Sequence, residues 1–362
     1  MENYTKKEIN DILDGYRRII GIYKKWDFDR IMSKQMQKST EILEDALSGN
    51  ECEPDAQLAK KIRKRMSVLG IKTGKINIRV NKCNKRQIIV EARVKSGCEK
   101  AEIMTEVIRE FFGENIYFSE NNKFALTDRF ADYVFYENPK FYILDGCAAI
   151  SRDAGEMSGD SYTFFKTGDS RFVMAISDGM GSGKAAAYDS AEVMNFIEEY
   201  LEAGFEVNDI SEIINMARIA VGNSNPITID IAMIDLEKAV LCMCKSGGAT
   251  TFVKSGDRVD IFLPSSLPLG IIEDAEAYVK NVKLKDGDYV IMISDGVADC
   301  LPFYDKESQL AHIIADIKSG NPAIMAEKIL EECRFYNNGN NQDDMTVLVA
   351  GIWETKNLQC KK

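Results

Sequence analysis

The spacing of hydrophobic and polar positions changes along the first 138 residues. Apolar positions first recur at helical spacing, and a second helical stretch runs from about Asp55 to Leu69, with Gly70 behind it. From about Lys75 the period becomes two, in KINIRVNKC and RQIIVEARV around the turn-like Asn84, and the helix-like AEIMTEVIREFF follows. This region is therefore predicted to hold helices and then a small α+β unit.

Beyond the Pro139-containing step before FYILDGCAAI, strands predominate. We expect strands at 171–177, 228–235, 239–244, 250–254, 288–294 and 345–352, and helices near 183–203, 208–222 and 306–334. Because many strands follow one another directly, two packed sheets with helices outside fit better than a βαβ repeat. We divide the chain into a regulatory region at 1–138, a second domain at 139–355 and a C-terminal tail at 356–362.

Composition supports a globular protein of two domains. The chain has 362 residues, and 45% of them are hydrophobic, which is enough for a real core. The sequence has no apolar run of the length that spans a membrane, and MENYTKKEIN lacks the apolar core of a signal peptide. Nine cysteines, without CxxC spacing, fit a reduced compartment. We therefore expect a soluble, cytoplasmic protein without structural zinc.

Charge and histidine content limit the chemistry. His312 is the only histidine, which excludes serine–histidine catalysis and histidine-rich zinc sites together. A formal net charge of −11 argues against a nucleic-acid surface, which needs concentrated basic residues. Carboxylates are left to carry any catalysis, and a protein or small molecule is the expected partner.

The strongest internal signal is a near-duplicate pair of segments. RFVMAISDGM and DYVIMISDGV are both apolar strands that deliver Ser-Asp-Gly, and they place Asp178 and Asp295 at strand ends. An aspartate followed by glycine can present its carboxylate while a cation approaches the backbone carbonyl. One Asp-Gly alone is most often a turn, but two after matched strands favour a site for a hard metal ion.

Two further acidic segments extend this set. Asp343 and Asp344 immediately precede the strand-like TVLVAGI, and adjacent like charges there repel unless a cation intervenes. Asp160 stands in the turn-like Ser-Gly-Asp-Ser that precedes YTFFK. Each segment alone fits a solvated turn as well as a site. Taken together, these carboxylates could build a centre of two metals with oxygen ligands only.

At this point the chain resembles a known family. The motifs Gly-Asp160, Ser-Asp178-Gly-Met-Gly, Pro-Leu269-Gly-Ile, Ser-Asp295-Gly and Asp343-Asp-Met-Thr follow the order seen in metal-dependent type 2C phosphatases, over about residues 140–354. The run SDGMGSGK is most similar to the stage II sporulation protein E phosphatases. The resemblance implies an α+β fold, a four-layer α-β-β-α sandwich, with two Mn²⁺ or Mg²⁺ ions between the sheets.

The resemblance also implies site residues, which by position are Asp160, Asp178, Gly179, Asp295, Asp343 and Asp344. Asp178 would bridge both ions and Gly179 would offer its carbonyl to one of them. Asp160 would bind or orient that ion's waters, and Asp295 and Asp343 would hold the other ion. The last two positions of the set are adjacent, and the pattern leaves open which of them is the ligand. Asp178, Asp295 and Asp343 are the implied catalytic residues.

The implied reaction is hydrolysis of a phosphoserine by metal-activated water, without a covalent phosphoenzyme. Family members elsewhere place a phosphate-gripping arginine shortly before the first acidic motif, where this sequence reads Ala154-Gly-Glu156. Orientation of the phosphate would then rest on metals and backbone amides. A phosphate-loop interpretation of GMGSGKA fails on its spacing, because Asp178 stands six positions before Lys184.

The resemblance further implies a substrate and partners. The substrate would be a phosphorylated anti-anti-sigma protein, whose dephosphorylation activates a sporulation sigma factor, and the N-terminal region could form a homodimer. Relatives carry a membrane region ahead of the part seen here, so a longer native form would be membrane-anchored. Two alternatives stay open: a catalytically silent scaffold with the same fold, and a stress-response phosphatase acting on a different anti-anti-sigma factor.

Overall fold

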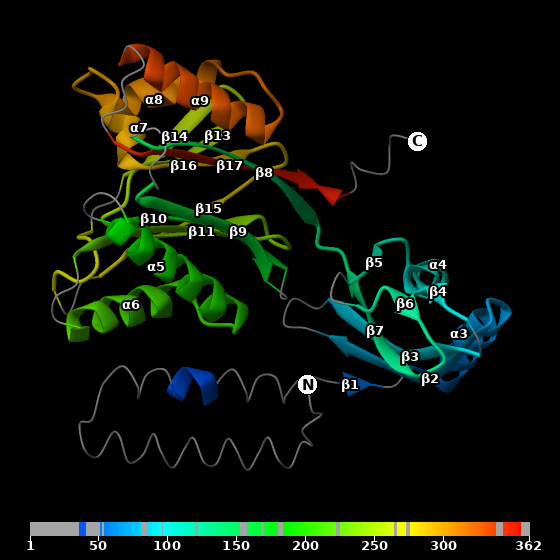
Figure 1. Ribbon diagram of the computed structural model, residues 1–362. Helices are drawn as coiled ribbons and strands as arrows, with labels where there is room; N and C mark the ends of the chain where they lie inside the picture. The colour runs from blue at the N-terminus through cyan, green and yellow to red at the C-terminus, as the bar shows by residue number, and fades with distance from the viewer. Residues whose placement is uncertain are drawn as a thin grey trace. The chain divides into compact units, whose positions relative to one another are not determined.

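The computed structural model describes most of the chain (Figure 1). The described residues are 36–40, 51–52, 54–80, 85–95, 97–119, 122–152, 158–167, 170–179, 184–221, 225–263, 266–272, 276–337 and 343–355. The helices expected before residue 36, Asn84, the glycine run at 180–183 and the tail at 356–362 lie outside them. Contacts divide the chain into two compact units, one of residues 44–139 and one of residues 1–43 with 140–362. The functional boundary at residue 138 stays a prediction.

The described strands are β1 Glu51–Cys52, β2 Ile71–Val80, β3 Arg86–Val94, β4 Glu99–Lys100, β5 Ile116–Phe118, β6 Ala125–Leu126, β7 Ala131–Glu137, β8 Phe141–Ile150, β9 Asp160–Thr167, β10 Arg171–Gly179, β11 Ile227–Asp235, β12 Val240–Ser246, β13 Thr251–Ser255, β14 Arg258–Phe262, β15 Tyr278–Lys283, β16 Tyr289–Ile293 and β17 Met345–Glu354. The described helices are α3 Ala56–Val68, α4 Met104–Phe112, α5 Lys184–Glu202, α6 Val207–Val221, α7 Asp295–Asp299, α8 Lys306–Asp316 and α9 Pro322–Tyr336.

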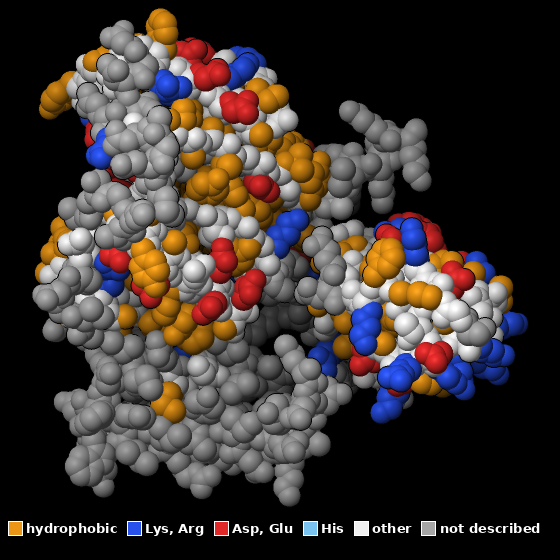
Figure 2. All heavy atoms as spheres, in the orientation of Figure 1, with side chains coloured by type: hydrophobic (Ala, Val, Ile, Leu, Met, Phe, Trp, Pro, Cys, Tyr) orange, Lys and Arg blue, Asp and Glu red, His pale blue; other side chains and the backbone are white. Residues whose placement is uncertain are grey.

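The unit of residues 44–139 is a small α+β fold. Its main sheet has the order β1-β2-β3-β7-β5, and α3 and α4 pack on it. Helix α3 buries Ile62 and Met66 at helical spacing and ends before Gly70, which takes a φ of +76° that favours glycine. The basic run from Lys60 to Lys64 is exposed apart from Ile62, so it is a solvated helix face; Figure 2 shows basic side chains gathered on the visible side of this unit.

The larger unit is a four-layer α-β-β-α sandwich, as predicted (Figure 1). One sheet has the order β15-β12-β11-β10-β9, and the other has the order β14-β13-β16-β17-β8. Helices α5 and α6 cover the first sheet, while α7, α8 and α9 cover the second. Every pairing within the two sheets is antiparallel.

Three apolar cores separate these four layers, and β10 shows how the sequence builds them. Phe172, Met174 and Ile176 pack into the core between the two sheets. Val173 and Ala175 point the other way, into the core under α5 and α6. A central strand with both faces buried is therefore apolar throughout, which is why RFVMAI shows no polar alternation.

The single helix expected at 306–334 is wrong, because two helices occupy this stretch. Helix α8 ends at Asp316 and α9 begins at Pro322. Asn321 caps α9 by accepting a hydrogen bond from the N–H of Ala323. A helix tolerates proline only in its first turn, because proline has no N–H to donate, so Pro322 marks the start of α9. Helical spacing on both sides of this break concealed it. None of the described helices combines the length and apolarity needed to cross a bilayer.

Candidate active site

The first acidic pair lies at the end of the β9–β10 ladder. Asp160 begins β9, Asp178 is the penultimate residue of β10, and the register places these two residues directly opposite each other. On the other side of β10, Asp178 is opposite Thr228 of β11, whose hydroxyl accepts a hydrogen bond of 3.3 Å from the N–H of Asp178. Strand pairing on both sides therefore fixes the backbone that carries the Asp178 carboxylate.

The second acidic group comes from the other sheet. Strand β16 ends at Ile293, Ser294 takes an extended conformation, and Asp295 is the first residue of α7. Asp343 and Asp344 precede β17, which is paired with β16. Gly296 packs so closely on the carbonyl of Asp344 that a Cβ there would overlap its oxygen. Pairing of β16 with β17 thus brings Asp295 beside Asp343.

Hydrogen bonds join the two acidic groups across the sandwich. Asp344 accepts from the backbone N–H of Gly159 at 2.5 Å through one oxygen, and from that of Arg152 at 2.8 Å through the other. The Thr346 hydroxyl donates to Asp160 at 2.7 Å. A Cβ built on Gly159 would lie 3.3 Å from an Asp344 carboxylate oxygen and 3.7 Å from one of Asp178. Carboxylates from both sheets therefore lie close to one another at this edge of the sandwich.

Electrostatic coupling shows that these side chains share one environment. Burial is the largest cause that raises the pKa of Asp178, and like-charge repulsion by Asp160, Asp295, Asp343 and Asp344 adds to it, so that this pKa is about 8. Burial raises the pKa of Asp160 to about 6, although hydrogen bonds from Thr346 and Ser294 oppose the shift. Burial and then Asp343 raise the pKa of Asp295. Such mutual repulsion is what a bound cation would relieve.

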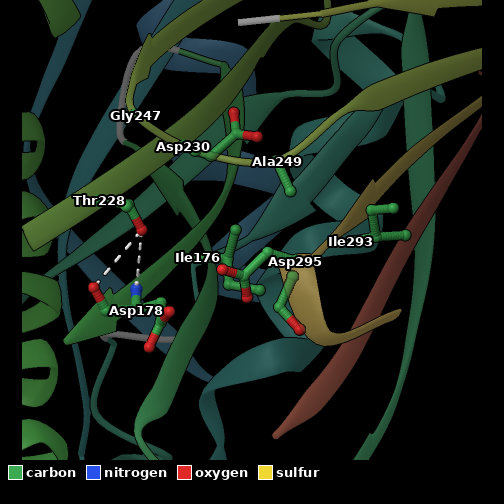
Figure 3. A pocket seen from close by; sticks show the side chains of 10 residues that line it. Ile176, Asp178, Thr228, Asp230, Gly247, Ala249, Ile293 and Asp295 are labelled. Atoms are coloured by element: carbon green, nitrogen blue, oxygen red, sulfur yellow. Dashed lines mark hydrogen bonds between the residues drawn. The ribbon is translucent and has the colours of Figure 1, made fainter. Parts of the chain in front are cut away.

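A small pocket adjoins the acidic cluster (Figure 3). Its volume is about 20 Å³, and Asp178, Asp295 and Ser294 line it together with Asp230 and the turn at residues 247–249. Among the described residues, no group of three or more His, Cys, Asp or Glu side chains is arranged so that it could hold a metal ion. The donor set nevertheless fits Mg²⁺ or Mn²⁺, because carboxylate and carbonyl oxygens are the ligands these hard cations prefer.

The structure brings all six predicted site residues to this edge of the sandwich: Asp160, Asp178, Gly179, Asp295, Asp343 and Asp344. Gly179 packs against α5, where a Cβ would lie 2.5 Å from the carbonyl oxygen of Ala186. Arg152 takes part through its backbone N–H. The segment around Leu269 forms a β-bridge with Ile227, which pairs with Gly179.

Sequence reasoning missed four polar residues around the site: Thr228, Asp230, Lys245 and Thr346. Asp230 and Lys245 lie in strands that are otherwise apolar and buried, ITIDIAMID and VLCMCKS. A charged residue inside a buried strand is itself a signal, because it is costly unless it is paired. Thr228 and Thr346 gave no such signal, since threonine is common in strands.

Comparison with known proteins agrees with this geometry. A family model described as Stage II sporulation protein E (SpoIIE) matches residues 168–353, which are 186 of the 362 residues. Stage II sporulation protein E of Priestia megaterium is 33% identical over 258 residues, which cover 70% of this chain and 44% of that protein. The phosphoserine phosphatase RsbU of Bacillus subtilis is 26% identical over 208 residues, covering 56% of this chain and 61% of RsbU.

Among solved structures, the PP2C phosphatase domain of Bacillus subtilis SpoIIE with a fragment of its regulatory domain matches with a TM-score of 0.66. The match covers 98% of this chain and 99% of that chain at 24% identity, and it shows that the fold is of PP2C type. This chain spans less than half the length of the Priestia megaterium relative.

Proposed function

Because the chain belongs to the stage II sporulation protein E family and carries its PP2C-type serine phosphatase domain, we propose that it hydrolyses phosphoserine on a protein, with Mn²⁺ or Mg²⁺ as cofactor. One observation carries the proposal. Carboxylates from four separate segments of the chain meet at one edge of the sandwich, and burial together with repulsion by the neighbouring carboxylates raises the pKa of Asp178 to about 8. A cluster of like charges this close is suited to binding divalent cations.

Asp178, the backbone carbonyl of Gly179, Asp295 and Asp343 would hold the metal ions. When bound, these ions supply the Lewis acidity and positive charge that phosphoester hydrolysis by water requires. Asp160 accepts a hydrogen bond from the Thr346 hydroxyl, and it would orient water at the site. The protein's own contribution is to fix these oxygens before the substrate arrives.

For the adjacent pair, the hydrogen bonds favour Asp343 as the ligand. Both carboxylate oxygens of Asp344 already accept backbone N–H groups, from Arg152 and Gly159. Asp343 is exposed, and it repels both Asp178 and Asp295. We therefore assign Asp344 to holding the segment before β9 against β17, and Asp343 to the metal centre.

By family membership, we propose a phosphorylated anti-anti-sigma protein as the substrate, and activation of a sporulation sigma factor as the outcome. We also propose a cytoplasmic catalytic domain, membrane-anchored where the native protein is longer, with a homodimer through the N-terminal region. The described helical residues 36–40 contact the phosphatase domain through an ion pair of 3.3 Å between Lys38 and Asp209. This contact supports docking of these residues on the domain.

The test is phosphate release from a phosphoserine-containing anti-anti-sigma protein. We expect turnover with Mn²⁺, none with EDTA, and none in Asp178→Ala. Asp235→Ala is the matched control. Asp235 is the last residue of β11, at the opposite end from Thr228, and it accepts hydrogen bonds from the backbone N–H groups of the local turn that follows. It should keep its activity. A folded parent protein that binds Mn²⁺ and releases no phosphate would instead favour the silent scaffold.

A further inference from the structure

Next to the acidic cluster, the interior of the sandwich holds a pair of opposite charges. Lys245 of β12 lies opposite Asp230 of β11 in the strand register, and their side chains are 0% and 1% exposed. The ammonium group of Lys245 donates to the Asp230 carboxylate and also, at 2.6 Å, to the carbonyl oxygen of Ala249. The Thr251 hydroxyl donates to the same Asp230 oxygen at 3.3 Å.

Stability alone is a poor reason for this arrangement. Burial raises the pKa of Asp230 and lowers that of Lys245, so desolvation works against charge on both partners. The second carboxylate oxygen of Asp230 is buried without a hydrogen-bond partner among the described residues. Replacing buried ion pairs with apolar side chains of similar size is often neutral or stabilising. Stability therefore does not explain why a charged pair occupies this place instead of an apolar one.

What distinguishes this pair is its position. Both partners of the Lys245 ammonium group, Asp230 and Ala249, line the pocket that Asp178 and Asp295 also line. In Figure 3, Asp230 and Ala249 lie at one end of this pocket, and Asp178 and Asp295 lie at the other. Asp230 is two residues along β11 from Thr228, which hydrogen-bonds the backbone of Asp178.

The turn at residues 247–249 is fixed on its outer side as well. Gly247 has a φ of +66°, and a Cβ there would lie 2.5 Å from the ring of Pro268. The Ser266 hydroxyl donates to the carbonyl of Lys245 at 2.7 Å. With Pro268 outside and the Lys245 ammonium inside, the turn has one position relative to β11.

We propose that Lys245 and Asp230 are positioning residues for phosphoester hydrolysis, tying the turn at residues 247–249 to β11 so that this pocket wall stands at a fixed place beside Asp178 and Asp295. The inference rests on the proposed phosphatase function. Neither side chain touches the reacting atoms. Their effect is on geometry, where displacement of a catalytic site by about 1 Å can cost about 10²-fold in rate.

The decisive variant is the double substitution Lys245→Met with Asp230→Leu, which replaces the pair by apolar groups and avoids leaving one charge buried alone. The probe is p-nitrophenyl phosphate with saturating Mn²⁺, because a small substrate reports on the pocket and not on protein docking. We expect a melting temperature close to that of the parent, a kcat at least about tenfold lower, and a KM within about threefold.

Lys254→Met is the matched control. Lys254 is also a buried lysine, 5% exposed, but its ammonium donates to the carbonyls of Ile314 and Ala315 at the end of α8, at 2.8 and 2.9 Å. This control should lower the melting temperature and leave kcat unchanged. A lower kcat with an unchanged melting temperature in the double variant, and the reverse in Lys254→Met, would separate positioning from simple stabilisation.

A folded double variant with the kcat of the parent overturns the proposal. If the double variant does not fold, Asp230→Asn takes its place, because it keeps the shape of the side chain while weakening the tie; the same loss of kcat is expected, and a parent-like kcat again overturns the role. A parent protein that turns over p-nitrophenyl phosphate in neither Mn²⁺ nor Mg²⁺ would instead refute the phosphatase function on which the inference rests.

Discussion

The tripeptide Ser-Asp-Gly occurs at two strand ends in this domain, and the two copies adopt different structures. Ser177, Asp178 and Gly179 continue β10 as extended strand. At the second copy, β16 has already ended, and Asp295 begins α7. The two local sequences are nearly the same for ten residues, RFVMAISDGM and DYVIMISDGV, so local preference does not decide between strand and helix here.

Pairing with neighbouring strands decides whether the Ser-Asp-Gly tripeptide is strand or helix. β10 is paired up to Asp178 by β9 and up to Gly179 by β11, whereas β16 loses β13 after Met292 and β17 after Ile293. The difference sets the charge environment of each aspartate. Four other carboxylates raise the pKa of Asp178, while the N–H of Gly296 hydrogen-bonds Asp295 at 2.8 Å and opposes the shift there. The first copy is the centre of the site, and the second is its edge.

The most direct test of the difference between Asp178 and Asp295 is to neutralise each aspartate separately. We expect Asp178→Asn to lower phosphate release by about 10³-fold or more, because the proposed role of Asp178 as a metal ligand would supply several kcal/mol of charge stabilisation. Asp295→Asn should cost about 10²-fold and recover in part at high Mn²⁺, since Asp343 remains beside it. Activity measured across a Mn²⁺ titration gives both values. Equal losses without recovery would contradict the distinction between centre and edge.

A second prediction concerns Gly296, the glycine that follows Asp295. Gly296→Ala should lower the free energy of unfolding by about 1–3 kcal/mol and weaken Mn²⁺ binding about tenfold, because its Cβ would push the Asp344 carbonyl and displace Asp343. Helix propensity alone predicts the opposite sign, since alanine is favoured within a helix. Denaturant unfolding and Mn²⁺ calorimetry measure both effects.

Gly320→Ala is the control for this substitution, because a Cβ there would meet only the Tyr289 hydroxyl, at 3.8 Å. It should leave stability and Mn²⁺ binding nearly unchanged. If Gly296→Ala behaves like this control, the close contact with Asp344 does not position Asp343.

The smallest expected effect is on stability against pH in EDTA. The folded pKa of Asp178 is raised to about 8, so the folded state binds more protons than the unfolded state between about pH 4 and pH 8. Stability is therefore highest at the acidic end of this window and falls as the pH rises. We expect the melting temperature of the metal-free protein to drop from pH 5 to pH 8, and Mn²⁺ to abolish the drop.

Asp178→Asn should flatten this pH dependence more than Asp295→Asn does, since Asp178 has more charged neighbours. A melting temperature that stays level or rises from pH 5 to pH 8 would show that the repulsion at the centre of the site is not present in solution.

Much of this architecture was predictable from the sequence, because the relevant signals are local. Continuous apolar stretches such as RFVMAI predicted the central strands, and the Asp-Gly and Asp-Asp pairs beside such strands predicted site residues. The peripheral strands β14 and β15 were not predicted, because strands at a sheet edge are more exposed and less apolar. The Lys245–Asp230 pair was also not predicted, because only the register of β11 with β12 places those residues opposite each other.

The position of β17 has a consequence for how the enzyme comes into being. This strand lies between β16 and β8, and the residues just before it supply both Asp343 and the Asp344 contacts to Gly159 and Arg152. A nascent chain that still lacks residues 343–355 therefore lacks the strand between β16 and β8, together with Asp343 and Asp344. Phosphatase activity should appear only after β17 has been translated, and products truncated before it should be inactive.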